Sequence, residues 1–159
     1  AAMLSALKPN NRDDFPAAPR IYSAYLQIRR PVMDRPDDPF VELDDIARAA
    51  GKEVARDAAI QFSDHITNTC NWLDDIGMKF ETFENYLNSN SFNLSDLYFD
   101  AYALFDDAKY AQIFRNRGFD GAIHSGSGET AGEAEYKVFS AKQVWLLSNK
   151  DSGYEKQAR

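Results

Sequence analysis

The sequence predicts an α+β fold on three observations. Around residues 21–28, apolar and polar side chains alternate, as they do in a half-buried strand. Amphipathic helix patterns fill the middle of the chain, and a strand-type composition returns after Gly118. With 159 residues, 44% of them hydrophobic and 13% aromatic, the chain can bury one hydrophobic core. We therefore expect one ordered domain of the α+β class.

The first part of the chain is predicted to be an arm, residues 1–19, followed by one strand. Three prolines in the arm disfavour both helix and strand. Residues 21–28 are predicted to form the strand because of their period of two. We expect Pro31 to end this strand and the proline- and aspartate-rich residues 36–39 to form a loop.

Helices are predicted for the middle of the chain. One long amphipathic helix is expected over residues 52–75, because apolar side chains recur there at spacings of four and three. Cys70 falls in this apolar stripe, which indicates a core residue rather than a nucleophile. A shorter helix is expected around residues 80–87.

Two further helices are predicted before the chain returns to strands. Apolar residues at helical spacing indicate the first of them around residues 94–104. The second is expected to be capped by Asp106 or Asp107, whose side chain can accept from a free N–H of the first turn. Gly118 is expected to end it in the left-handed conformation.

Short strands and one long loop are predicted for the C-terminal part. Residues 119–124 are a strand candidate, followed by a glycine- and serine-rich loop over residues 125–132. Two more strands are expected at residues 136–139 and 144–147. A tail, residues 151–159, completes the chain.

The charge balance argues against a polyanionic partner. The net charge is −7, whereas nucleic acids and anionic membranes bind cationic surfaces. A single cysteine and two histidines cannot complete a zinc site without carboxylates. No apolar run approaches the roughly 20 residues that span a bilayer. We therefore expect neither nucleic acid nor a membrane as partner, and no metal.

Glu133 and Glu135 are the candidates for chemistry that stand out in the sequence. Residues two apart on a strand project to the same face, and these two follow a loop that could cover a ligand. One of two adjacent carboxylates can stay ionised while the other shares a proton, which suits a reaction that develops positive charge. The alternative interpretation is a solvated pair on an exposed strand face.

Segments at both ends of the chain resemble the ADP-ribosyltransferase superfamily. They are Tyr25–Val32 near the start, then Gly118–Ile123, Glu135–Phe139 and Lys142–Val144. The pattern is most similar to the ADP-ribosyltransferase-like family of phage and plasmid polyvalent proteins. Its Glu-Tyr-x-Val-aromatic strand is similar to that of poly(ADP-ribose) polymerases. The resemblance implies a split β-sheet over residues 20–150 with a large helical insertion at about 40–117.

The same resemblance implies an activity and its site residues. NAD would be the substrate, without a metal, and a protein would accept the ADP-ribose, for instance on arginine. Glu135 matches the family's catalytic glutamate, and Glu133 matches the glutamate with which arginine-modifying members engage the acceptor. Tyr136 and His124 are implied as contacts to NAD. The implied location is the bacterial cytoplasm, or a phage virion that delivers the protein there.

The sequence departs from the family pattern before Tyr25. The family's first strands hold the adenosine side and the nicotinamide of NAD, and no segment here matches them. One interpretation is that a companion N-terminal segment or other subunits of a larger assembly complete the site. The alternative is a catalytically degenerate fold that serves as a structural or interaction module of a phage particle or polyprotein. An acidic decoy of a polyanion is a third interpretation.

Overall fold

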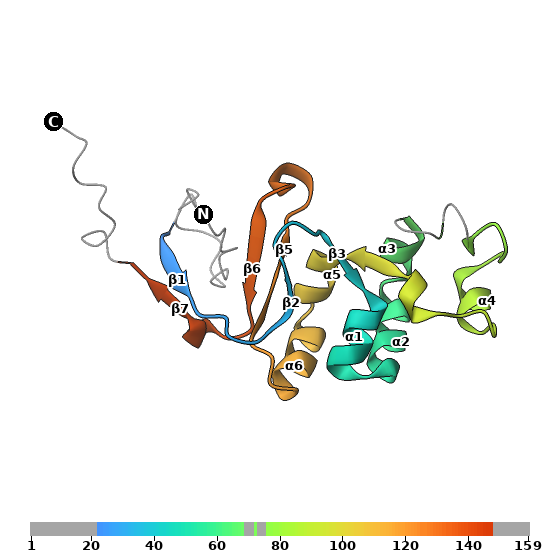
Figure 1. Ribbon diagram of the computed structural model, residues 1–159, viewed down its shortest axis with the longest axis horizontal. Helices are drawn as coiled ribbons and strands as arrows, with labels where there is room; N and C mark the ends of the chain where they lie inside the picture. Colours follow the sequence, from blue (N-terminus) through green and yellow to red (C-terminus); the bar gives the residue numbers. More distant parts are fainter. Residues whose placement is uncertain (1–21, 69–71, 73–75, 148–159) are drawn as a thin grey trace, which may run out of the picture.

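The structure is a computed structural model that describes residues 22–68, 72 and 76–147. Three strands come first, helices with one further strand follow, and three strands come last, so the predicted α+β class is confirmed (Figure 1). The strands form three small sheets. Their members are β1 (Ala24–Leu26) with β7 (Val144–Leu146), β2 (Pro31–Arg35) with β5 (Gly121–Ser125) and β6 (Ala134–Val138), and β3 (Phe40–Glu42) with β4 (Tyr98–Asp100).

The three-stranded sheet brings together a strand from the first part of the described chain and two strands from its last part. Its order is β2-β5-β6, with β2 parallel to β5 and β6 antiparallel to β5. The prediction that Pro31 ends a strand is wrong, because Pro31 is the first residue of β2. Proline has no N–H to donate, and the first position of a strand tolerates this loss.

Six α-helices are described. They are α1 (Leu43–Ala50), α2 (Lys52–Gln61), α3 (Ser63–Asn68), α4 (Phe83–Leu87), α5 (Ala101–Phe105) and α6 (Ala108–Asn116). The prediction of one helix over residues 52–75 is wrong, because α2 ends at Gln61 and a separate helix, α3, begins at Ser63; residues 69–71 and 73–75 lie outside the described residues. A further helix, α1, was missed; Gly51 separates it from α2 with a φ of +102°, which favours glycine. Cys70 lies outside the described residues.

The predicted helix over residues 94–104 is also wrong. A short 3₁₀ turn, Leu94–Asp96, is capped by the Asn93 side chain, which accepts from the N–H of Ser95. The chain then extends as β4 and only afterwards forms α5. Strand β4 pairs with β3, so the segment 40–117 contains a two-stranded sheet as well as helices.

The last helix follows its prediction closely. The Asp107 side chain caps α6 by accepting from the N–H of Lys109. Gly118 follows the helix with a φ of +85°. Since a left-handed residue satisfies the last free carbonyls of a helix, the local sequence defines both ends of α6.

The hydrophobic core has an aromatic centre. Phe62 stacks on Phe99 with ring centroids 4.9 Å apart, and Tyr110 lies 5.5 Å from Phe62. Helices α5 and α6 lie between the β2-β5-β6 sheet and the pair α1–α2, and therefore cover one face of that sheet (Figure 1). In the described part of the chain, no helix has the length and apolar character to cross a membrane.

Candidate functional site

Glu135 lies in β6, directly opposite His124 of β5. Directly paired residues of antiparallel strands project to the same face of a sheet. The Glu135 side chain is half-buried, and its Oε1 atom lies 2.9 Å from the hydroxyl oxygen of Thr130. That hydroxyl also lies 2.9 Å from the main-chain oxygen of Ser127, and its single hydrogen can be donated to either acceptor.

The loop that precedes β6 is closed by its own hydrogen bonds. The N–H of Gly126 donates to the main-chain oxygen of Glu133 at 2.7 Å, and the N–H of Gly132 donates to the Ser125 hydroxyl at 3.2 Å. A β-carbon on Gly126 would lie 2.8 Å from Glu135 Oε1 and 2.5 Å from the main-chain oxygen of Thr130. Glycine at position 126 therefore allows the loop backbone to approach the carboxylate closely.

Glu133 does not belong to the strand that carries Glu135. It lies one residue before β6 and is exposed. The expectation that both glutamates project from one strand is therefore wrong. The physical reason is the left-handed Gly132, with a φ of +86°, which delays the start of the strand until Ala134.

His124 is buried completely and is not open to solvent. Its Nδ1 atom lies 2.8 Å from the main-chain oxygen of Ser125, and its ring stacks on Phe105 with centroids 5.8 Å apart. Its Nε2 atom is buried without a hydrogen-bond partner among the residues that the structure describes. The environment is that of a core histidine rather than of a residue on an open ligand surface.

Tyr136 lies next to Glu135 in β6 and is 46% exposed. Successive side chains of a strand project to opposite faces, so Tyr136 and Glu135 face different sides of the sheet. The structure therefore brings Glu135 and His124 to one face, places Tyr136 on the other, and leaves Glu133 outside the strand.

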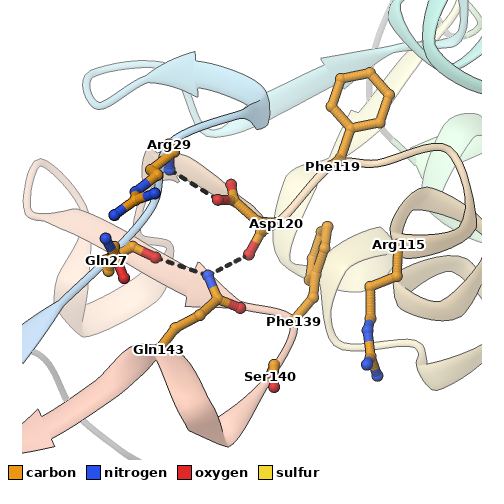
Figure 2. Close-up of a pocket in the computed structure, with 8 residues that line it drawn as sticks. All are labelled: Gln27, Arg29, Arg115, Phe119, Asp120, Phe139, Ser140 and Gln143. Atoms are coloured by element: carbon orange, nitrogen blue, oxygen red, sulfur yellow. Dashed lines mark hydrogen bonds between the residues drawn. The ribbon is translucent and has the colours of Figure 1, made fainter.

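A cavity of about 360 Å³ lies at the other end of β6. Its lining residues are Gln27, Arg29, Arg115, Phe119, Asp120, Phe139, Ser140 and Gln143 (Figure 2). Four residues along a strand, from Glu135 to Phe139, correspond to about 13 Å. The cavity is therefore separate from the predicted site. The sequence analysis did not predict it, because Arg29 and Arg115 lie 86 positions apart in the sequence and no local pattern connects them.

Potential metal ligands do not gather in the described ranges. No group of three or more His, Cys, Asp or Glu residues there could hold a metal ion. In the aspartate-rich segment after β2, Asp38 and Asp45 instead form ion pairs with Arg35, at 3.4 Å and 2.5 Å.

Comparisons with protein-family models, with curated proteins and with solved structures find no match for this chain.

Proposed function

We propose that this chain is an ADP-ribosyltransferase-like domain in which Glu135 is the catalytic carboxylate. The supporting observation is the environment of Glu135. Its side chain is half-buried, its Oε1 atom lies next to the Thr130 hydroxyl, and the backbone of Gly126 lies close to the same oxygen. A carboxylate held in this way is preorganised to stabilise a positive charge, because it does not reorganise when the charge develops.

The proposed reaction breaks the bond between the nicotinamide nitrogen and C1′ of the ribose. The bonding electron pair leaves with the nicotinamide, which becomes neutral, and the ribose becomes an oxocarbenium-like cation. A nucleophilic group of the protein acceptor then attacks C1′, forms the new glycosidic bond and releases its proton to solvent water. Glu135 would stabilise the cation, and the Thr130 hydroxyl would orient the carboxylate.

The described residues supply only part of such a site. Near Glu135 they provide Thr130, the Gly126 backbone and a buried His124. In this proposal, the remaining contacts to NAD come from a companion N-terminal segment or from another subunit.

The direct test is NAD turnover with labelled NAD and a mixture of acceptor proteins. Glu135→Gln keeps the shape of the side chain and removes its charge, so we expect NAD turnover to fall about 100-fold. Glu129→Gln is the matched control, since Glu129 is an exposed glutamate of the same loop. Equal turnover by the wild type and Glu135→Gln would contradict the assignment.

A second candidate function is that of an interaction module without turnover. The β1–β7 ribbon favours it, because Tyr25 pairs directly with Trp145 and the two are 67% and 49% exposed. This ribbon extends away from the helices (Figure 1). A two-stranded ribbon is marginally stable alone, so an added strand from another polypeptide would stabilise it.

Calorimetric titration with NAD separates the two candidates. Binding of NAD that is weakened by Glu135→Gln would favour the transferase. Absence of NAD binding and of turnover, both in this chain alone and in the chain together with the companion segment or subunit, would favour the module.

A further inference from the structure

The cavity at the end of β6 combines two cations with an aromatic wall. It lies between the segment that follows β1, the end of α6 and the segment that follows β6, as Figure 2 shows. Its volume of about 360 Å³ falls within the range of small-molecule sites. In Figure 2, Arg29 and Arg115 lie on opposite sides of Phe139, and the Arg29 guanidinium lies next to Gln27.

The framework of the cavity is fixed by hydrogen bonds that do not involve a ligand. The Gln143 amide donates to the main-chain oxygens of Gln27 and Asp120, at 2.7 and 2.8 Å. The Asp120 carboxylate accepts from the backbone N–H groups of Arg29 and Arg30, at 2.9 and 2.8 Å. These bonds connect three separate segments, so the cavity is formed before any ligand binds.

The charge of the cavity is unusual for so acidic a chain. The Arg115 guanidinium has no hydrogen-bond or ion-pair partner among the described residues. With the Gln27 amide in its favoured orientation, the Arg29 guanidinium donates to this neutral oxygen and to no other acceptor among the described residues. Asp120 is the one carboxylate among the lining residues, and both its oxygens accept backbone N–H groups. The cavity therefore carries a net positive charge although the whole chain carries −7.

The apolar part of the lining is aromatic. Phe139 is largely buried, and its ring faces the cavity (Figure 2). Phe119 lines the same cavity and supports the Arg30 guanidinium 5.0 Å from its ring centroid. A flat apolar group can pack against Phe139, while an anionic group next to it can pair with a guanidinium.

We propose that this cavity binds a small aromatic phosphate monoester. Arg115 donates to the phosphate oxygens, the aromatic body packs against Phe139, and Arg29 adds a second positive charge to the lining of the cavity. This site is distinct from Glu135 and does not depend on the proposed transferase activity.

The test is calorimetric titration of the full chain with phenyl phosphate, inorganic phosphate and phenol. We expect phenyl phosphate to bind more tightly than inorganic phosphate, and phenol not to bind measurably. Arg115→Gln should weaken the binding of phenyl phosphate at least about tenfold. Arg117→Gln is the matched control: it removes an exposed arginine two residues further along that does not line the cavity.

Several results would overturn the proposal. The first is that the wild-type protein does not bind phenyl phosphate. The second is equal affinity for phenyl phosphate and inorganic phosphate. The third is that Arg115→Gln and Arg117→Gln weaken the binding of phenyl phosphate equally. Thermal unfolding of each variant checks that the fold is retained. Glu135→Gln should leave the binding of phenyl phosphate unchanged, so failure of this proposal and failure of the transferase proposal are distinguishable.

Discussion

The side-chain amide of Gln143 donates to the main-chain oxygen of Asp120 at 2.8 Å. The same amide nitrogen donates to the main-chain oxygen of Gln27, 116 residues earlier in the sequence. The two bonds connect the segment before β7 to the start of β5 and to the segment after β1. In this fold, Gln143 has a structural role, because it holds together three segments that are distant in the sequence.

We predict that Gln143→Leu destabilises the protein by about 1–3 kcal/mol, because two carbonyl oxygens lose their partner in a half-buried place. Gln112→Leu is the control, since the Gln112 amide donates to the exposed Asn116 and to nothing else within the described residues. Urea unfolding of the two variants measures the difference. If Gln143→Leu loses no more free energy of unfolding than Gln112→Leu, the two hydrogen bonds of Gln143 contribute little to stability.

Tyr110 gives a prediction at alkaline pH. Its side chain is fully buried, and its hydroxyl has no partner within the described part of the chain. Burial, assisted by the negative charges of Asp57 and Asp107, raises the pKa of Tyr110 from 10.0 to about 12. The unfolded chain loses this proton first. The raised pKa therefore contributes fully to the free energy of unfolding below about pH 10, and this contribution is lost as the pH rises toward 12.

Tyr110→Phe tests this prediction. The variant should be as stable as the wild type at pH 7, or slightly more stable, because it removes a buried hydroxyl without a partner. Its stability should also fall less steeply between pH 10 and 12. Urea unfolding as a function of pH measures both effects, and parallel pH profiles would contradict the assignment.

We predict that Arg35 contributes more to the stability of the protein than Arg48, which shares its partner Asp45. The Arg35 guanidinium pairs with Asp38, Glu42 and Asp45, and also lies near the main-chain oxygen of Phe40. Arg35→Ala leaves three carboxylates without this cation, so we expect a loss of about 1–3 kcal/mol. High salt should reduce the loss because it screens the repulsion.

Arg48→Ala is the control for this prediction. Arg48 also pairs with Asp45, but its side chain is 68% exposed against 34% for Arg35. We expect a change within about 0.5 kcal/mol, as is usual for exposed ion pairs. Thermal unfolding at low and high salt compares the two variants, and equal losses would show that the partial burial of Arg35 contributes nothing.

His124→Ala should destabilise the protein by about 2–4 kcal/mol, because it leaves a cavity beside Phe105 and removes the bond to Ser125. Chemical unfolding measures the loss. If His124 instead contacts NAD, the variant will be as stable as the wild type and will lose only NAD binding.

Parts of the fold could be predicted from local sequence alone. Both ends of α6 were identified, because Asp107 and Gly118 act through hydrogen bonds and dihedral angles of their own segment. The strand around Ile123 was also found from its composition. Strand β4 was missed, because Leu94, Leu97, Tyr98 and Ala101 have the spacing of a helix. Tyr98 and Phe99 form a strand only by pairing with β3.

The candidate site, too, could be predicted only in part from the sequence. The sequence indicated that Glu135 stands on a strand after a glycine-rich loop, and the structure has it there. It could not show that Gly132 keeps Glu133 off that strand, that His124 is fully buried, or that Arg29 and Arg115 line one cavity. Local patterns determine elements and their ends, because these depend on neighbouring residues. Only the packing of distant segments decides which side chains meet, because their contacts join residues that no local pattern relates.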